Sequence, residues 1–414
     1  MDLLISPSHL SGTVEAIPSK SDVHRLLICA ALARGRTVIK CPAASQDIEA
    51  TVRCLRALGA VIEYSGGCFT VTPIAKPALG PTLDCGESGS TLRFLLPVAA
   101  ALCSSAEFIG GGRLPDRPIA DLRAAMEEAG AVFSRPRLPF SVLGPMSGRS
   151  FTLPGNVSSQ YVTGLLFALG AMGGGEIILT TPLESEGYVD MTLGAMERFG
   201  VDVHKTPQGY RVLPMVFVSP GTVKAEGDWS NAAFFLIAGA LNRVRVTGLE
   251  PRSAQGDKEI IARLRSFGAR VEAENGDCTV SPGTSRALRA DIRQTPDMLP
   301  ALAVLAALGK GTSEFSGCGR LRLKESDRLI TVRDMILGLG GCAQITGDGL
   351  SVTASPLTGG TVDAQGDHRI AMAAAIGAAW AAGDTVLKGA EAVGKSYPRF
   401  WEDYRRLGGK YHVI

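Results

Sequence analysis

The chain has 414 residues and nearly balanced charge, with 42 basic against 40 acidic side chains and a formal net charge of +2. That balance argues against nucleic acid or an anionic membrane as a partner held by bulk electrostatics, so any anion must be bound locally. With 45% apolar and 20% charged residues the chain is expected to fold, and its length predicts two domains.

Cysteine spacing and the length of the apolar runs indicate the cellular compartment and whether the chain crosses a membrane. The nine cysteines include no C-x-x-C pair, so they indicate neither a disulfide framework nor a zinc site, and a reducing cytoplasm is the expected compartment. No signal peptide is expected in residues 1–17. Apolar stretches such as residues 370–383 fall short of the ~20 residues that cross a bilayer, and they are predicted as buried helices.

One signal recurs along the chain: an amphipathic helical stretch that ends in an apolar residue, a glycine and a small residue. These glycines lie 68 to 72 residues apart, at Gly59, Gly130, Gly200, Gly268, Gly340 and Gly408. Glycine can adopt the left-handed conformation that ends a helix, and regular spacing of such ends indicates a repeated structural unit. We therefore predict six copies of one unit.

Each unit also contains a predicted β-hairpin, a second helix and a short strand. Alternating sequence with a central turn follows most of the glycines, as in residues 269–282. The second helix is apolar nearly all round and must be covered on every side, so it is predicted to form the core. Six stretches fit this description: residues 21–35, 89–105, 158–172, 229–243, 297–311 and 367–383.

The repeat predicts an α/β fold of two similar domains, with three strand–helix units in each. The sixth copy stops at residues 410–414 after a single strand, one short of its hairpin. We infer that a strand around residues 2–7 supplies the missing partner. The predicted domains are therefore residues 19–225, and residues 1–18 together with 226–414.

Polar residues and one glycine gather at the starts of the six buried helices, where free N–H groups and the helix dipole favour anions. They are Lys20, Ser21, Gly89, Ser90, Ser158, Ser159, Gln160, Asp228, Ser230, Asp297, Asp367, His368 and Arg369. Ordinary N-capping accounts equally well for Asp228, Ser230 and Asp367. It does not account for Lys20 and Arg369, because a positive charge opposes the dipole there. An anionic ligand shared with the helix ends would resolve that conflict.

Further charged residues lie in predicted loops: Arg117, Lys324, Glu325, Arg328 and Lys395. Taken singly, each also fits an exposed surface charge, and single matches of this kind are often false. Because cations recur at corresponding places in the units, the set favours a cleft in which both domains face one anionic substrate.

The segments PSKSDVHR from residue 18, GESGSTLRF from 86, LPDRPI from 114, SSQ from 158, SEGY from 185, EGDWS from 226, PDMLP from 296, RLRLKESDR from 320, GDHRIAM from 366 and GKSYPRF from 394 form an ordered set. They resemble the EPSP synthase (3-phosphoshikimate 1-carboxyvinyltransferase) family of enolpyruvyl transferases. The resemblance implies an inside-out α/β barrel fold, with three βαβαββ repeats around buried parallel helices in each of two lobes that close around substrate. It also implies transfer of the enolpyruvyl group of phosphoenolpyruvate to the 5-hydroxyl of shikimate 3-phosphate, with release of phosphate, in the shikimate pathway.

Carried over position by position, the resemblance gives Asp297 as proton acceptor, Glu325 as proton donor and Lys20 as a third catalytic residue. For shikimate 3-phosphate it implies contacts from Lys20, Ser21, Arg25, Ser158, Ser159, Gln160, Ser185, Asp297 and Lys324. For phosphoenolpyruvate it implies Lys20, Gly89, Arg117, Gln160, Arg328, Arg369 and Lys395. Two polyanionic substrates need several fixed cations, and two carboxylates in different environments can divide the proton transfers. No metal or organic cofactor, nucleic acid or membrane is implied, and a monomer is expected.

Other classes of protein remain open at this point. A UDP-N-acetylglucosamine enolpyruvyl transferase would share the fold, but those enzymes usually have Lys-Asn where this chain has Lys20-Ser21. They also carry a reactive cysteine in a loop that here, at residues 110–119, has none. A non-catalytic repeat scaffold is a second alternative. RNA 3′-phosphate cyclase is a third, but its chemistry uses a nucleophilic histidine, and orienting its neighbours is the simpler role for His368.

Overall fold

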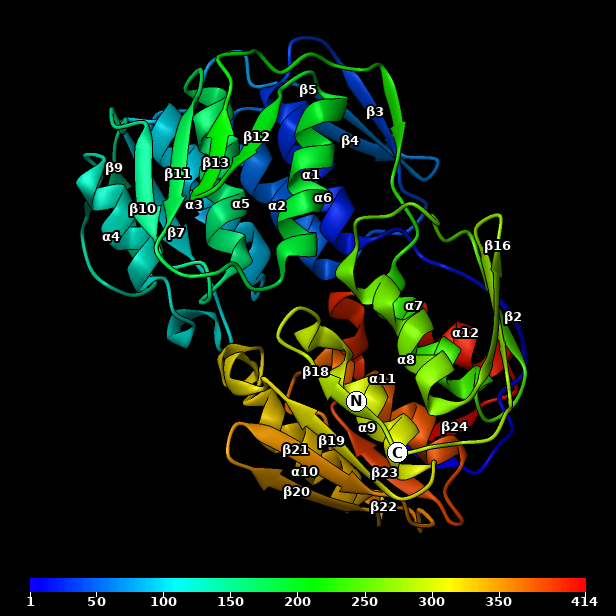
Figure 1. The fold of residues 1–414 in the computed structure, drawn as a ribbon. Coiled ribbons are helices and arrows are strands. Elements are labelled where there is room, and N and C mark those ends of the chain that lie inside the picture. The colour runs from blue at the N-terminus through cyan, green and yellow to red at the C-terminus, as the bar shows by residue number, and fades with distance from the viewer. The chain divides into compact units, whose positions relative to one another are not determined.

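The computed structural model describes residues 1–414, and the chain divides into two compact units (Figure 1). The C-terminal unit comprises Met1–Ile17 and Glu226–Ile414, and the N-terminal unit comprises Pro18–Ala225. Each unit has its own hydrophobic core. None of the helices is both long enough and apolar enough to cross a lipid bilayer.

The N-terminal unit contains three four-stranded sheets, each with one parallel and two antiparallel strand pairs. Their strand orders are β14-β3-β5-β4, β6-β7-β9-β8 and β10-β11-β13-β12. The strands are β3 (Thr37–Lys40), β4 (Val61–Ser65), β5 (Cys68–Thr72), β6 (Thr82–Asp84), β7 (Ser105–Ile109), β8 (Val132–Phe133), β9 (Phe140–Leu143), β10 (Ser150–Leu153), β11 (Gly175–Leu179), β12 (Val203–Thr206), β13 (Gly209–Val212) and β14 (Thr222–Lys224). The helices are α1 (Lys20–Leu32), α2 (Gln46–Leu58), α3 (Gly89–Leu102), η1 (Leu114–Asp116), α4 (Ala120–Glu128), α5 (Ser159–Ala171) and α6 (Glu186–Arg198).

The C-terminal unit repeats this plan with sheets ordered β16-β17-β15-β2, β18-β19-β21-β20 and β22-β23-β1-β24. Its strands are β1 (Leu3–Ser6), β2 (Gly12–Glu15), β15 (Val244–Thr247), β16 (Arg270–Glu274), β17 (Asp277–Ser281), β18 (Arg289–Asp291), β19 (Thr312–Ser316), β20 (Cys342–Thr346), β21 (Gly349–Thr353), β22 (Gly360–Asp363), β23 (Thr385–Lys388) and β24 (Lys410–Val413). Its helices are α7 (Trp229–Gly239), η2 (Gly256–Glu259), α8 (Ile260–Phe267), η3 (Pro296–Met298), α9 (Leu299–Ala307), η4 (Gly319–Leu323), α10 (Arg328–Gly338), α11 (His368–Ala379), η5 (Ala390–Lys395) and α12 (Phe400–Arg406).

The helix-ending glycines behave as the repeat requires. All six have positive φ, from 76° at Gly200 to 115° at Gly59. At Gly59 the backbone N–H bonds back to the carbonyls of Arg56 and Leu55, which closes the last turn of α2. A side chain at these six positions would meet the steric penalty of the left-handed region. The predicted sixfold repeat is therefore confirmed, because the same helix end recurs in every unit.

Three buried helices form the centre of each unit: α1, α3 and α5 in one, and α7, α9 and α11 in the other. Almost every residue of these helices is buried, as their all-round apolar sequence predicts. Because the sides of these helices are buried, their polar side chains lie mainly in the first turn. These starts hold most of the residues singled out in the sequence.

The first strand of the chain completes the last sheet. β1 pairs antiparallel with both β23 and β24, and its Leu4 lies opposite Val386 on one side and His412 on the other. β1 therefore lies in the position of the second strand that the sixth hairpin lacks.

Candidate active site

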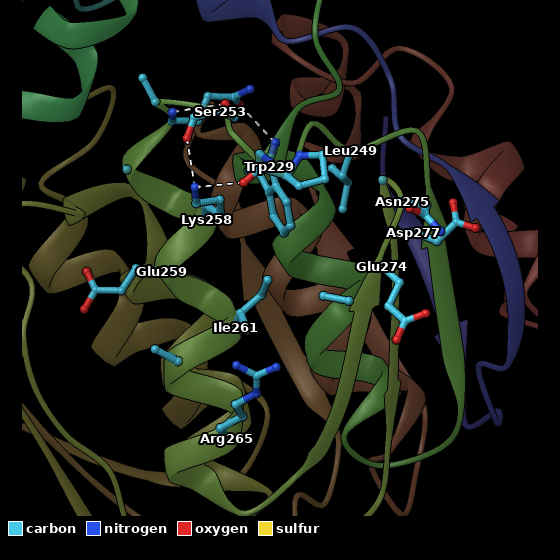
Figure 2. A pocket seen from close by; sticks show the side chains of 17 residues that line it. Trp229, Leu249, Ser253, Lys258, Glu259, Ile261, Arg265, Glu274, Asn275 and Asp277 are labelled. Carbon is cyan, nitrogen blue, oxygen red and sulfur yellow. Dashed lines mark hydrogen bonds between the residues drawn. The ribbon is translucent and has the colours of Figure 1, made fainter.

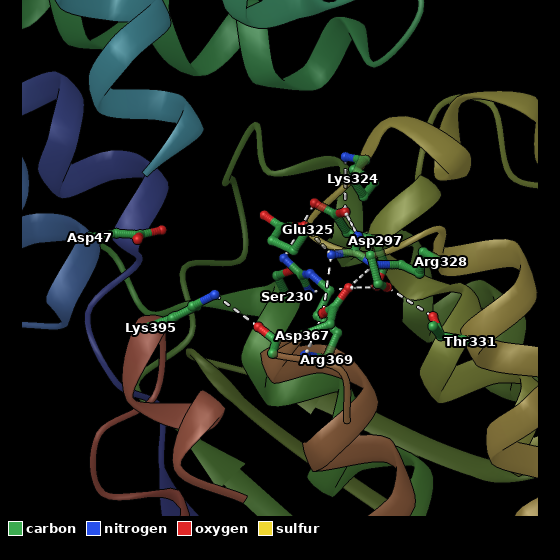
Figure 3. A network of polar contacts seen from close by, with 12 residues as sticks. Asp47, Ser230, Asp297, Lys324, Glu325, Arg328, Thr331, Asp367, Arg369 and Lys395 are labelled. Atoms are coloured by element: carbon green, nitrogen blue, oxygen red, sulfur yellow. Dashed lines mark hydrogen bonds and ion pairs between the residues drawn. The ribbon is translucent and has the colours of Figure 1, made fainter. Parts of the chain in front are cut away.

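Side chains from widely separated segments of the C-terminal unit converge in one polar network (Figure 3). The contributors are Ser230 from the first turn of α7, Asp297 from η3, Lys324 and Glu325 from the loop after η4, Arg328 from the start of α10, and Asp367 and Arg369 from the start of α11. Because each lies at or just before a helix start, the helix axes place them and the packed core holds them there.

Arg328 is the centre of this network and is only 1% exposed. Its Nε donates to Asp367 Oδ2 at 2.9 Å, its Nη1 to Asp297 Oδ1 at 2.6 Å, and its Nη2 to Glu325 Oε2. Burial lowers the pKa of this guanidinium, but the three carboxylates outweigh burial and raise the pKa above its usual value. The charged stretch at residues 321–330 therefore contributes a buried cation, and not only a solvated face.

Asp297 is held by three cations. Its Oδ1 lies 3.1 Å from Lys324 Nζ and 2.6 Å from Arg328 Nη1, and its Oδ2 lies 3.3 Å from Arg369 Nη2. Burial raises the pKa of this carboxyl, but the charges of Arg369, Lys324 and Arg328 overcome burial and hold the pKa well below its usual range. Burial lowers the pKa of Lys324. Asp297 is thus an ionised carboxylate, the form that can accept a proton.

The positive charge at the start of α11 is balanced by protein groups. Asp367 caps the helix by accepting from the Arg369 backbone N–H at 3.0 Å, and the Arg369 side chain donates through Nη1 to Ser230 Oγ at 2.7 Å. Lys395, at the end of η5, donates from Nζ to the carbonyl oxygen of Gly366 at 2.8 Å. The carboxylates of Asp297 and Asp367 thus already offset the unfavourable interaction between the Arg369 charge and the helix dipole.

In the N-terminal unit, Lys20 begins α1 and pairs with an acid that sequence reasoning missed. Its Nζ lies 2.7 Å from Oδ2 of Asp47, in the first turn of α2, and each side chain is 13% exposed. The pair fixes the lysine at the helix start and reduces its conflict with the dipole.

Arg25 lies one turn further along α1 and is 2% exposed. It donates to Thr192 Oγ1 at 2.9 Å, to the carbonyl of Ser21 at 2.5 Å and to the carbonyl of Tyr188 at 2.6 Å. These bonds use three of its five N–H groups. Arg25 therefore ties α1 to α6 in addition to any role with a ligand.

Gly89 begins α3 where two arginines approach the helix. A Cβ at this position would lie 2.5 Å from Arg117 Nη1 and 2.8 Å from Arg93 Nη1, so only glycine leaves room for both guanidinium groups. Arg93 Nη1 also donates to Gln160 Oε1 at 2.8 Å, and Gln160 Nε2 donates to Ser90 Oγ at 3.0 Å. The structure thus brings Gly89, Arg117 and Gln160 into one cluster.

Three of the serines expected to contact shikimate 3-phosphate lie at helix N-termini. Ser158 is the N-cap of α5 and Ser159 is its first residue. Ser185 is the N-cap of α6 with φ 59°, in the left-handed region that serine seldom adopts. A strained backbone of this kind persists where the surroundings enforce it, often at functional sites.

The repeat shows which residues were missed. In each unit the loop or turn that leads into the amphipathic helix supplies one of these polar residues: Asp47, Arg117, Ser185, Asp257, Glu325 and Lys395. Four of the six were predicted from the sequence, and those of the first and fourth units were not. The only sequence signal for Asp47 and Asp257 is their equivalent place in the repeat.

A solved structure shows the fold of the chain, and a family model shows its class. The solved structure of the enolpyruvyl transferase NikO from Streptomyces tendae matches with a TM-score of 0.76 at 18% identity, covering 99% of this chain and 98% of that one, so the two share a fold. The chain belongs to the EPSP synthase (3-phosphoshikimate 1-carboxyvinyltransferase) family, whose family model matches residues 5–404. The fold and the family that the sequence predicted are both confirmed.

Similar proteins carry the family name. A 3-phosphoshikimate 1-carboxyvinyltransferase from Clostridium perfringens strain 13 is 38% identical over 416 residues, which cover 98% of each chain. Another from Methanocorpusculum labreanum is 37% identical over 420 residues, covering 99% of each. The solved structure of EPSP synthase from Acinetobacter baumannii matches with a TM-score of 0.84 at 25% identity and covers 100% of both chains.

Proposed function

We propose that this chain transfers the enolpyruvyl group of phosphoenolpyruvate to the 5-hydroxyl of shikimate 3-phosphate and releases phosphate, in the shikimate pathway. Membership of the EPSP synthase family supports the activity. The observation that carries the chemistry is the network in the C-terminal unit, where Asp297 and Glu325 lie against a buried arginine.

The two carboxyl groups divide the proton transfers. In the addition step Asp297 accepts the proton of the 5-hydroxyl as its oxygen attacks C2 of phosphoenolpyruvate, and Glu325, which enters the step in its protonated form, delivers that proton to C3. In the elimination step a proton returns from C3 to Glu325, the double bond re-forms, and phosphate leaves with the proton held by Asp297. Atoms and charge balance across the two steps.

The cations around Asp297 set when it can act. In the chain alone, Lys324, Arg328 and Arg369 keep its pKa low, which makes it a weak base. Substrate carboxylate and phosphate groups compete for these cations, which raises the basicity of Asp297 once both substrates are bound. The same cations then stabilise the phosphate as it leaves.

The remaining assignments follow the family motifs. For phosphoenolpyruvate we propose contacts from Lys20, Gly89, Arg117, Gln160, Arg328, Arg369 and Lys395. For shikimate 3-phosphate we propose contacts from Lys20, Ser21, Arg25, Ser158, Ser159, Gln160, Ser185, Asp297 and Lys324. Lys20 is proposed as the third catalytic residue. The cations, helix N-termini and strained Ser185 described above support these roles.

We also propose that the protein acts as a monomer in the cytoplasm. Its nine unpaired cysteines support a reducing compartment. Its net charge of +2 supports the absence of a nucleic-acid partner. Size-exclusion chromatography with light scattering measures the oligomeric state directly.

A phosphate-release assay tests the activity. The purified protein is given phosphoenolpyruvate with either shikimate 3-phosphate or UDP-N-acetylglucosamine as acceptor. We expect phosphate only with shikimate 3-phosphate. Release with UDP-N-acetylglucosamine alone would assign the chain to the other enolpyruvyl transferase, and release with neither acceptor would favour a binding scaffold.

A further inference from the structure

Asp257 is a buried acid that lies outside the ten sequence segments that carry the family resemblance. It lies in η2, is 2% exposed, and hydrogen-bonds through its side chain to Ser230. Ser230 Oγ accepts a 2.7 Å hydrogen bond from Arg369 Nη1. Because a guanidinium can only donate, the single hydroxyl hydrogen of Ser230 is left for the Asp257 carboxylate. The bonds therefore run in one direction, from Arg369 through Ser230 to Asp257.

The two elements that carry this chain of bonds are tied together. Gln255 Oε1, just before η2, accepts from the backbone N–H of Trp229 at 3.0 Å, and Trp229 Nε1 donates to the carbonyl of Glu250 at 3.1 Å. The next residue of η2, Lys258, donates to the carbonyls of Pro251 and Ser253, both at 3.1 Å, beside a pocket of about 660 Å³ (Figure 2). Asp257 is thus a fixed acceptor and not a mobile one.

This chain of hydrogen bonds holds the guanidinium of Arg369, which the carboxylate of Asp297 also attracts. Arg369 Nη2 lies 3.3 Å from Asp297 Oδ2, whereas Arg328 Nη1 lies 2.6 Å from the other oxygen of the same carboxylate. The attraction of Arg369 toward Ser230 and Asp257 opposes its attraction toward Asp297. Without that restraint, the charge of Asp297 would draw the guanidinium closer.

The buried charge of Asp257 destabilises the folded state, which indicates that the carboxylate has a role other than packing. Burial, followed by the nearby carboxylate of Asp297, raises the pKa of Asp257 to about 6, with Asp228 acting in the same direction. The charge of Arg369 and the bond from Ser230 act in the opposite direction. A neutral side chain would avoid this cost but would lose the charge that strengthens the bond from Ser230, so packing alone does not explain a carboxylate here.

We propose that Asp257 is a positioning residue that, through Ser230, limits how closely the Arg369 guanidinium approaches Asp297 and orients it toward the anionic groups of phosphoenolpyruvate. This inference rests on the proposed function, since it assigns Arg369 to that substrate. Asp257 itself touches no substrate.

The test compares Asp257→Asn, Ser230→Ala and the double variant with wild type in steady-state assays that vary each substrate in turn. Each single variant is expected to raise KM for phosphoenolpyruvate about tenfold, the size of effect typical for loss of one charge-assisted hydrogen bond. KM for shikimate 3-phosphate should stay within about twofold. The double variant should match the singles, because both changes break one chain of bonds. Asp277→Asn, which removes a half-buried carboxylate of the same unit bonded to Arg245, is the matched control and should equal wild type.

Three outcomes would overturn the proposal: unchanged KM for phosphoenolpyruvate in both single variants, equal rises in both KM values, or a double variant whose loss is the product of the single losses. If Asp257→Asn does not fold, Asp257→Glu takes its place, because it keeps the charge but moves the acceptor by one methylene. The same selective rise and the same non-additivity are then required. A wild-type protein with no phosphate release would refute the proposed function itself, a result that the variants cannot mimic.

Discussion

Arg328 offers the sharpest test of how the network is held together. Arg328→Gln removes a buried cation that binds Asp297, Glu325 and Asp367. Asp297 keeps Lys324 and Arg369, but Asp367, which is 0% exposed, keeps only the backbone N–H of Arg369 and the hydroxyl of Ser326. Removing one partner of a buried ion pair costs about 3–5 kcal/mol, mainly because the other charge stays buried. We expect a loss of that size in the free energy of unfolding of the C-terminal unit.

The three tryptophans make this loss measurable in one unit alone. Trp229, Trp380 and Trp401 all belong to the C-terminal unit, so urea unfolding followed by their fluorescence reports on it without signal from the other unit. With a urea m-value of about 1–3 kcal/mol/M, the midpoint should fall by at least about 1 M.

Two further variants control for other causes. Arg322→Gln removes an arginine that is 41% exposed and pairs with half-buried Asp327, so it should cost about 0–1 kcal/mol. Adding Asp367→Asn to Arg328→Gln removes the stranded carboxylate while keeping a good N-cap, and should recover part of the loss. A loss below about 1 kcal/mol in Arg328→Gln, or no recovery in the double variant, would refute the reasoning.

The remaining predictions concern turnover, pH and one glycine. Asp297→Asn and Glu325→Gln should each lower kcat at least about 100-fold while shikimate 3-phosphate binding, measured by calorimetry, changes little; rates near wild type would remove their assignment as proton carriers. The pKa of Asp257 is about 6 in the folded state against an ordinary ~3.9, so the folded state binds a proton more readily than the unfolded state. The free energy of unfolding therefore rises as pH falls toward 5. Between pH 7 and pH 5 wild type should therefore gain about 1 kcal/mol relative to Asp257→Asn in urea titrations, and parallel curves would contradict this. Gly89→Ala should push Arg117 aside and raise KM for phosphoenolpyruvate selectively in initial-rate assays. An unchanged KM would show that phosphoenolpyruvate binding does not require Arg117 in the position that Gly89 allows.

The repeat and its buried helices were predictable because their signals are local. Gly59 and its five counterparts end helices by their own backbone conformation, and an all-apolar helix such as α9 is buried whatever its neighbours are. Strand β1 could be assigned because the last repeat visibly lacked a partner.

The acids that hold the cations were harder to predict, because their role depends on contacts across the chain. Asp47 meets Lys20 from 27 residues away, and Asp257 meets Ser230 at the same sequence separation. Neither acid stands in a motif, and an acid near a helix start is explained equally well by the dipole. Only the fold shows which cation each one faces.

Product analysis tests the central claim most directly. The protein is incubated with phosphoenolpyruvate and shikimate 3-phosphate, and the products are followed by mass spectrometry and phosphorus NMR. We predict one new compound with the mass of both substrates less one phosphoric acid, formed one to one with free phosphate, and none in Asp297→Asn. Formation of pyruvate and phosphate while shikimate 3-phosphate remains unchanged would contradict enolpyruvyl transfer by this chain.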